Sequence, residues 1–502
     1  MLAQKLILSY SSRLVIQFIQ LVVGVIVARI VGPSVIGTVA FGLSYVSMFL
    51  FLTDMGTSTA HIKLIADGEN EGNVITTFAY IKISLIILFT IVVMAVFGIQ
   101  KVILHHSFEN SDYDLVILLT LFTTFLGQFF QIPQATFVAH VEQAKQDIPD
   151  MLNNIMHQAF RLIVVFLGYK AVALVSARLL ATIIIIPFYF YLFRSYPRGK
   201  FDRQLAKKFF SISLPVVVIL FSQSIIYWSD KVILQFLTNS KEVGYYAASF
   251  GFTNFLTLIQ NSTGTIFFPT FAKNILKNDY SSINNKISKY ERFNFIYVFP
   301  LVVMLAVYSE LIVKLVLGKL YLATIPIFSI TIIAVFIPII NLPYGNLLLG
   351  KGMFTLSAKI FFSAMSFFVV AAFGMASPSI FNLGGIGIAL ALLSSNLLLG
   401  ILFLFFIKKT TPEVKILQHK NVMLYGLLYS IIFYFIFNHI EHSVISAVIF
   451  ALVFFTVYWG GLALFKLTNR DDLFFLKEIL NLKKLKTYMK DEINLKKKDE
   501  NN

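Results

Sequence analysis

The stretch Val444–Leu464 reads VISAVIFALVFFTVYWGGLAL and contains no charged residue in its 21 positions. About 20 consecutive apolar residues in a helix span the hydrocarbon core of a bilayer. Residues 115–130 (LVILLTLFTTFLGQFF) form a second run of this kind, and neither run alternates apolar with polar residues as barrel strands do. Because lipid offers no partners for backbone polar groups, such runs must be helical. The sequence therefore predicts an all-α integral membrane fold.

The composition supports the same fold class for the whole chain. Of 502 residues, 58% are hydrophobic and 13% are charged, whereas soluble domains carry about 25% charged residues. The mean hydropathy is +0.80. The chain has no Cys, which excludes disulfides, thiolate metal sites and thiol nucleophiles. The first apolar segment, near 7–31, is too long for a signal peptide, and we expect it to be the first span.

Apolar segments of membrane-spanning length occur about fourteen times along the chain. They lie near 7–31, 37–60, 75–99, 114–139, 150–169, 171–193, 209–237, 242–270, 292–316, 322–349, 354–376, 384–407, 421–438 and 443–466. An even number of spans places both termini on the same side of the membrane.

The distribution of Lys and Arg predicts the orientation of these spans. With the N-terminus in the cytoplasm, 30 of the 41 Lys and Arg residues fall in cytoplasmic segments and 5 in outer loops. Cytoplasmic loops of membrane proteins carry this excess of basic residues. The net charge of +16 therefore faces anionic lipid headgroups rather than a nucleic acid. We expect both termini to be cytoplasmic.

The loops between the predicted spans argue against an enzyme. The longest outer loop covers about 100–113, whereas membrane polymerases and glycosyltransferases place their chemistry on larger outer loops. The chain has no GxxxxGK[ST] phosphate loop, which argues against direct ATP hydrolysis. The histidines of the outer loops have no carboxylate at ligand spacing apart from Glu441, so neither a metal nor a cofactor is expected.

Two segments of the sequence align without a gap at an offset of 207 residues. Residues 26–37 (IVARIVGPSVIG) and 233–244 (ILQFLTNSKEVG) each end a helix in a polar turn and open the next helix with a glycine. The fourth and tenth spans also correspond, near Pro133 and Pro343. We expect two six-helix lobes in parallel orientation with a substrate site between them. The predicted domains are a first lobe (1–207), a second lobe (208–410), two further helices (411–467) and a basic cytoplasmic tail (468–502).

Four segments resemble the sequence signatures of a known family. They are residues 27–37, Asp54-Met55-Gly56, residues 229–234 followed by 242–248, and residues 384–389. In combination they resemble polysaccharide and O-antigen flippases, which form a branch of the MATE-like superfamily of multidrug, oligosaccharidyl-lipid and polysaccharide exporters. The similarity covers the first twelve predicted spans, and residues 350–353 (GKGM) depart from the usual family pattern. The resemblance implies a fourteen-helix, two-lobe fold.

The resemblance also implies a function. A flippase of this family would move a polyprenyl-diphosphate-linked oligosaccharide, such as an O-antigen or capsule unit, across the bacterial or archaeal cytoplasmic membrane by alternating access. Its energy would come from an H+ or Na+ gradient or the membrane potential, and its partners would include membrane lipids and glycan polymerase machinery. A peptidoglycan-precursor flippase and a MATE-type drug or cation exporter stay open as alternatives. A membrane polysaccharide polymerase is disfavoured by the short outer loops.

Polar side chains within spans are costly in lipid, so each marks a candidate site. Several follow one helix face at i, i+4, i+7 spacing. The expected cavity residues are Arg13, Gln17 and Gln20 in the first span, Asn154, Gln158 and Arg161 in the fifth, Arg178 in the sixth, and Gln223 and Tyr227 in the seventh. Guanidinium groups match phosphate oxygens, and amides suit sugar hydroxyls. For Arg13, snorkelling to the cytoplasmic interface is the alternative.

Three further charged residues are candidates for gating or for coupling to an ion. Asp54 lies near the inner end of the second span, and Asp230 and Lys231 lie near the outer end of the seventh. Adjacent side chains leave a helix about 100° apart, so no direct pair between Asp230 and Lys231 is expected. Glu310 and Lys314 are spaced i, i+4 and are expected to form a structural ion pair.

Overall fold

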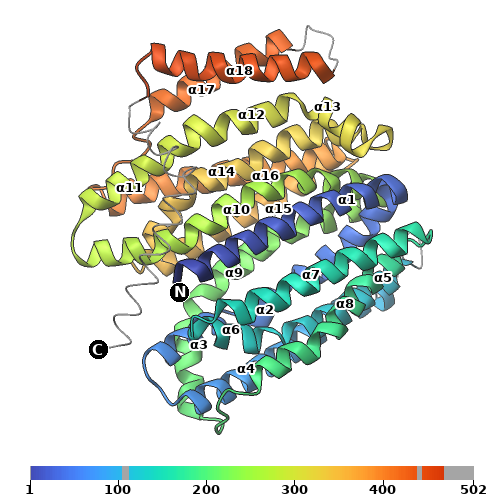
Figure 1. Ribbon diagram of the computed structural model, residues 1–502, viewed down its shortest axis with the longest axis vertical. Helices are drawn as coiled ribbons and strands as arrows, with labels where there is room; N and C mark the ends of the chain where they lie inside the picture. Colours follow the sequence, from blue (N-terminus) through green and yellow to red (C-terminus); the bar gives the residue numbers. More distant parts are fainter. Residues whose placement is uncertain (1, 104–111, 438–443, 469–502) are drawn as a thin grey trace. The chain divides into compact units, whose positions relative to one another are not determined.

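The computed structural model describes residues 2–103, 112–437 and 444–468, although some side chains, including those of residues 2–15, are not described. Figure 1 shows helices joined by short connections, and no strand occurs among these residues. The predicted all-α class is confirmed for this part of the chain. Ten stretches of it are long and apolar enough to cross a membrane. The predicted basic tail lies outside the described residues apart from residue 468.

The helices follow one another closely along the chain. The first half contains α1 (Leu2–Ser47), α2 (Phe51–Asp54), α3 (Thr57–Ala66), α4 (Glu71–Gly98), the π-helix η1 (Ile99–Ile103), α5 (Asp112–Gln128), α6 (Gln131–Ala139), α7 (Gln143–Phe166), α8 (Ala171–Phe193), α9 (Arg203–Leu237) and α10 (Ser240–Leu276). The second half contains α11 (Tyr280–Phe293), the π-helix η2 (Asn294–Val298), α12 (Phe299–Val307), α13 (Ser309–Ile312), the π-helix η3 (Val313–Leu317), the 3-10 helix η4 (Lys319–Tyr321), α14 (Thr324–Gly350), α15 (Phe354–Ala376), α16 (Gly384–Thr410), α17 (Lys420–Phe437) and α18 (Val444–Leu464).

The ten apolar stretches relate to the fourteen predicted spans in two ways. The first two predicted spans fall within one stretch, Ile16–Ala66, in which α1 consists of two helices joined across a kink at the non-helical Gly32 (φ 77°, ψ 173°). The helices α7, α10 and α17 also coincide with predicted spans, but they are too polar or too short to count among the ten. The described residues therefore form a multi-pass helical membrane protein, and the number fourteen stays a prediction.

Two of the predicted spans are broken helices. The second predicted span (37–60) contains the end of α1, all of α2 and the start of α3. Its last break, between α2 and α3, lies at Met55 and Gly56, whose φ angles of 46° and 84° are in the left-handed region. Glycine adopts this region without a steric penalty, so Gly56 suits the break. The fourth predicted span divides into α5 and α6 at Phe129 and Phe130. Within membranes, irregular backbone is tolerated where it is buried in protein or lines a cavity, so both breaks mark places where a site can form.

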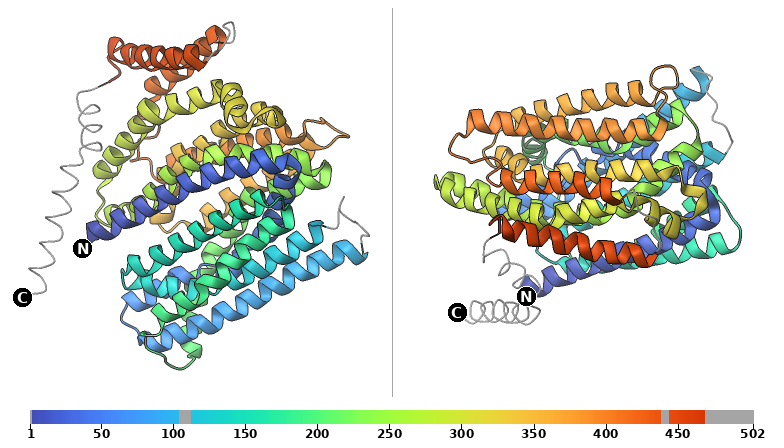
Figure 2. Two further views of the ribbon diagram at one scale, coloured as in Figure 1. Left: turned by 45° about the vertical axis from the view of Figure 1, so that its right-hand side comes forward. Right: turned by 90° about the horizontal axis from the view of Figure 1, so that it is seen from above.

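The chain divides into two compact units. The first comprises Met1–Gly251 and Met365–Ile388, and the second comprises Phe252–Ala364 and Ala389–Asn502. In the first unit, α1 packs against α5, α7, α8 and α9, and α4 packs against α2, α3, α5, α6 and α9. In the second unit, α12 packs against α14, α17 and α18, and α17 and α18 lie side by side (Figures 1 and 2). The predicted lobe boundaries stay a prediction.

The two turns related by the sequence repeat pack against each other within the first unit. A Cβ atom on Gly37 would lie 1.8 Å from the carbonyl oxygen of Ser240, and a Cβ atom on Gly244 would lie 1.9 Å from that of Pro33. Pro33 and Ser240 are themselves equivalent at the offset of 207, so the contact is reciprocal. The hydroxyl oxygens of Ser34 and Ser240 are 2.8 Å apart. Each repeated glycine is therefore required because a backbone carbonyl occupies the place of a side chain.

We expect Gly37→Ala and Gly244→Ala each to destabilise the protein by about 1–3 kcal/mol or more, because the added methyl group forces two backbones apart. Gly24→Ala is the matched control on α1, since nothing lies within 4 Å of a Cβ at that position and Ala is the better helix former. Thermal unfolding of the three variants in detergent measures the difference. Equal unfolding midpoints for Gly37→Ala and Gly24→Ala would show that the two turns are not in contact.

Candidate functional site

Polar side chains from α1 and α7 meet in the first unit. Gln20 Nε2 donates a hydrogen bond to Asn154 Oδ1 at 2.9 Å. Asn154 Nδ2 in turn donates to the carbonyl oxygen of Asp150, one helical turn earlier, at 2.8 Å. Two turns further along α7, Arg161 Nη1 donates to Gln158 Oε1 at 2.8 Å. The structure thus joins predicted cavity residues of the first and fifth spans along one face of α7.

Arg178 lies on α8, which packs along α7. Its side chain is exposed, although α8 is one of the apolar stretches and the neighbouring Ala177 and Ala181 are fully buried. An arginine that faced lipid there would cost several kcal/mol, so we expect Arg178 to face water or a polar ligand. The charges of Arg161 and Arg178 lie close enough to act on each other, and both act on His157 of α7.

The two arginines have no carboxylate partner among the residues that the structure describes. The ion pairs of this part of the chain join other groups. Arg161 is held by the buried amide of Gln158 instead. Two cations beside one another on membrane helices, with amides on the same face, form a site for an anion, because the anion supplies the missing charge. We call Gln20, Asn154, Gln158, Arg161 and Arg178 the arginine face.

The other predicted cavity residues lie on α1 and α9. Gln17 is half-buried on α1, less than one turn before Gln20. Gln223 and Tyr227 lie on α9, which packs along α1, and Tyr227 is exposed. Arg13 belongs to α1, but its side chain is outside the described part of the structure, so its role stays a prediction.

The prediction that Asp230 and Lys231 do not pair was wrong. Lys231 Nζ lies 3.0 Å and 2.9 Å from the two carboxylate oxygens of Asp230. Both side chains are largely buried, with 2% of Asp230 and 12% of Lys231 exposed. Two charges without water must neutralise each other, and the lysine side chain is long enough to fold back. The ammonium also lies 4.8 Å from the ring centre of Phe250 and 5.5 Å from that of Tyr246.

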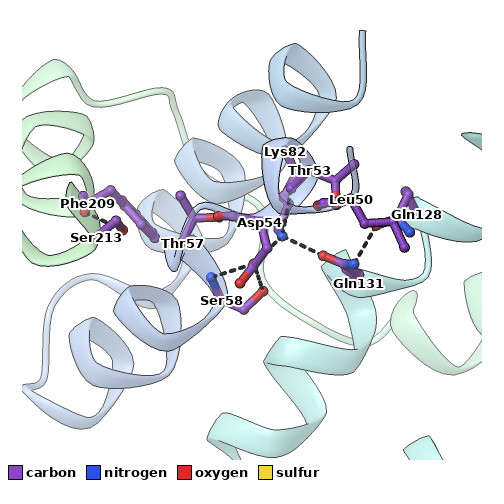
Figure 3. A network of polar contacts seen from close by, with 10 residues as sticks. All are labelled: Leu50, Thr53, Asp54, Thr57, Ser58, Lys82, Gln128, Gln131, Phe209 and Ser213. Carbon is purple, nitrogen blue, oxygen red and sulfur yellow. Dashed lines mark hydrogen bonds and ion pairs between the residues drawn. The ribbon is translucent and has the colours of Figure 1, made fainter. Parts of the chain in front are cut away.

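A third polar cluster surrounds Lys82 on α4 (Figure 3). Its ammonium donates to Asp54 Oδ1 and Gln131 Oε1, each at 2.5 Å, and to the carbonyl oxygen of Thr53 at 3.1 Å. These acceptors come from the two helix breaks, because Thr53 and Asp54 end α2 and Gln131 begins α6. The Lys82 side chain is fully buried, whereas 32% of the Asp54 side chain is exposed.

The acceptors around Lys82 are themselves held in place. Ser58 donates to Asp54 Oδ1 from its backbone N at 3.1 Å and from its Oγ at 2.5 Å. Gln131 Nε2 donates to Gln128 Oε1 at the end of α5. Asp54, which we predicted as a gating or coupling residue, therefore belongs to a network that joins α2, α3, α4, α5 and α6. Sequence reasoning did not single out Lys82, although its place within a predicted span was an available signal.

Comparisons with known proteins show a family from one match and a fold from others. Residues 26–326 match a family model described as "Polysaccharide biosynthesis protein". No curated protein matches the sequence.

Three solved structures show the fold. An inward-facing multidrug resistance MATE family transporter of the MOP superfamily has a TM-score of 0.66 at 14% identity, covering 79% of this chain and 96% of that chain. The lipid II flippase MurJ in an inward closed conformation has a TM-score of 0.66 at 16% identity, covering 91% and 100%. A MOP superfamily transporter from Pyrococcus furiosus, described as having a binding pocket of reverse polarity, has a TM-score of 0.54 at 14% identity, covering 81% and 94%. At these identities the similarity establishes the fold alone.

Proposed function

Because the chain belongs to the polysaccharide biosynthesis protein family, we propose that it is a flippase for a lipid-diphosphate-linked oligosaccharide in the cytoplasmic membrane. The observation that carries the proposal is the arginine face. Arg161 and Arg178 are two cations on membrane helices without a carboxylate partner among the described residues. A diphosphate carries concentrated negative charge, and guanidinium groups donate hydrogen bonds that match its oxygens.

The amides of the arginine face fit the remainder of the head group. Gln20 and Asn154 already exchange a hydrogen bond with each other, and sugar hydroxyls can replace it because a hydroxyl both donates and accepts. The polyprenyl chain stays in lipid, where its transfer to water would be unfavourable. In this proposal fourteen spans form two six-helix lobes and two further helices, both termini are cytoplasmic, and the head group crosses by alternating access. An ion gradient or the membrane potential supplies the energy.

Two rival functions differ from this one in their cargo. A drug or cation exporter requires acidic groups to attract a cationic drug, whereas the arginine face repels one. A peptidoglycan-precursor flippase handles the same diphosphate chemistry, and the similarity in fold to MurJ keeps it as the second candidate. Both flippases would bind the same diphosphate, so the arginine face does not distinguish their sugars. The identity of the sugar must be decided by experiment.

Deletion of the gene in its source organism is expected to remove a surface polysaccharide and to accumulate its lipid-linked repeat unit in the inner leaflet. Mass spectrometry of extracted lipids and staining of the surface glycan measure the two effects. Restoring the wild-type gene is the control. Accumulation of the peptidoglycan precursor instead would select the rival flippase, and increased sensitivity to cationic drugs with a normal surface glycan would contradict the proposal.

A further inference from the structure

We propose that Lys82 occupies a coupling-cation site and that this site therefore exchanges protons rather than Na+. This inference rests on the proposed function, and it names the ion whose gradient drives the proposed transport. The ammonium of Lys82 is bound by one carboxylate oxygen, one backbone carbonyl oxygen and one amide oxygen, from Asp54, Thr53 and Gln131. We call these three residues the oxygen cage (Figure 3).

The oxygen cage has the composition of a site for a hard metal cation. Such cations are bound by carboxylates, backbone carbonyls and amide oxygens. In transporters, backbone carbonyls freed at interrupted helices bind Na+ or handle H+. Here two interruptions, between α2 and α3 and between α5 and α6, meet at one point. The cage therefore lies where a coupling ion is expected, and a tethered ammonium fills it.

The charge balance of the cage decides against a metal ion. With Lys82 protonated, its charge and that of Asp54 cancel, and the lysine side chain is fully buried. A Na+ ion added to this place would bring an uncompensated positive charge into a site with little water, which is unfavourable. Lysine differs from a metal ion in that its charge can be removed by loss of a proton. The event that corresponds to binding or release of a metal ion is therefore protonation or deprotonation of Lys82.

The proton has a short route from Lys82 to the exposed side of Asp54. It leaves Lys82 Nζ, where the electron pair of the broken N–H bond remains, and it binds to Asp54 Oδ1, which is 2.5 Å away. The Asp54 side chain is 32% exposed, so its carboxyl group can pass the proton to water. The neutral amine binds the Thr53 carbonyl less strongly than the ammonium does. Loss of the proton thus loosens the end of α2 next to the left-handed residues Met55 and Gly56.

Other titratable groups on the helices around Lys82 contribute to its field. His61 of α3 lies within electrostatic range of Lys82 and is bound through Nε2 to Thr136 Oγ1 of α6 at 3.0 Å. His140 of α6 acts on His61 and lies 3.1 Å from a carboxylate oxygen of Glu71 on α4. α9 contributes the ring of Phe209, which stacks on His61. Protonation of either histidine opposes the charge on Lys82, so the wild type and the Lys82 variants are compared at the same pair of pH values on the two sides of the membrane.

Lys82→Arg tests the exchange of protons, because a guanidinium keeps the charge and the donors but does not lose its proton. Purified protein is reconstituted with a polyprenyl-diphosphate-linked oligosaccharide, and flipping is measured with and without a pH gradient in Na+-free buffer. We expect the gradient to accelerate the wild type and to have no effect on Lys82→Arg. If the arginine side chain does not fit and Lys82→Arg fails to fold, the double variant Asp54→Asn/Lys82→Met is used instead, because it removes both charges and keeps the site neutral. It too is expected to lose the acceleration by the pH gradient. A wild-type response in either folded variant overturns the proposal.

A second measurement needs no substrate. Unfolding midpoints in detergent are compared in NaCl and in choline chloride of equal ionic strength. The midpoint of the wild type is expected to be the same in both salts, because the ammonium fills the cage. Lys82→Ala vacates the cage, so Na+ is expected to raise its midpoint, whereas Lys101→Ala, in the exposed pair with Asp114, is the control and shows no difference.

The outcomes separate the two proposals. Specific stabilisation of the wild type by Na+, or no effect of Na+ on Lys82→Ala, contradicts the assignment of the cage. If the wild type moves no lipid-linked glycan, the proposed function fails, while the salt comparison still decides whether the cage is a cation site.

Discussion

Arg161→Ala is expected to abolish export of the lipid-linked glycan while the protein still inserts into the membrane. Arg161 Nη1 is held by Gln158 Oε1 and has no carboxylate partner among the described residues, so its charge is available to the cargo. A hydrogen bond to a charged group contributes about 1.5–3 kcal/mol, so losing one or two lowers the transport rate by about tenfold or more. Surface glycan, normalised to the amount of protein in the membrane, measures the effect.

Two variants make this result specific. Arg161→Lys is expected to retain part of the export, because it keeps the charge but loses the planar pair of donors. Arg194→Ala also removes an arginine side chain, but one that lies just beyond the end of α8 and over the ring of Tyr191. This variant is expected to export the glycan normally. Normal export by Arg161→Ala, or an equal loss in Arg194→Ala, would contradict the assignment of the arginine face.

Asp230→Ala is expected to lower stability by about 3–5 kcal/mol, because it leaves the largely buried ammonium of Lys231 without its counter-charge. The matched control is Glu310→Ala in the pair with Lys314, which was predicted from the sequence and is confirmed. There 61% of the Glu310 side chain is exposed, and such a pair contributes about 0.3–0.5 kcal/mol. Thermal or denaturant unfolding in detergent compares the two variants.

A double variant separates the charge from the packing. Asp230→Ala/Lys231→Met removes both charges and is expected to recover much of the stability, because replacing a buried ion pair by apolar side chains is often neutral. Similar small effects of Asp230→Ala and Glu310→Ala would show that the Asp230–Lys231 pair is not buried from water.

The sequence predicted the helices well because membrane helices are long and apolar. Residues 115–130 are an example, since they cover most of α5. The same run does not reveal the break between α5 and α6. Hydropathy is averaged over about 20 residues and cannot resolve an interruption of two residues. The other break lies at Gly56, a residue type that the sequence does display. Helix ends and breaks depend on partners from other helices, which a single sequence does not contain.

The candidate site was predictable only where its residues share a helix. Helical spacing placed Asn154, Gln158 and Arg161 on one face of α7, and the structure joins this face to Gln20 of α1. Lys82 could not be paired from the sequence, because Asp54 lies 28 positions and Gln131 49 positions away. Contacts between residues so far apart in the sequence are determined by how the helices pack, and helical periodicity does not predict them.

The Asp230–Lys231 error has a different cause. The angle between neighbouring residues on a helix describes where the side chains begin, not where the flexible lysine ends. Burial then decides the geometry, since a lysine ammonium without water moves to the nearest carboxylate.

Transport of the diphosphate head group is tested most directly in vesicles that contain the purified chain and no other protein. A polyprenyl-diphosphate-linked oligosaccharide is placed in one leaflet, and its arrival in the other is measured with a membrane-impermeant reagent that modifies the sugar. Wild-type protein is expected to move this lipid, to leave a polyprenyl-linked sugar without phosphate behind, and to lose the activity in Arg161→Ala. Equal movement in vesicles without protein, or of the phosphate-free lipid, would contradict a flippase that holds its cargo by the diphosphate.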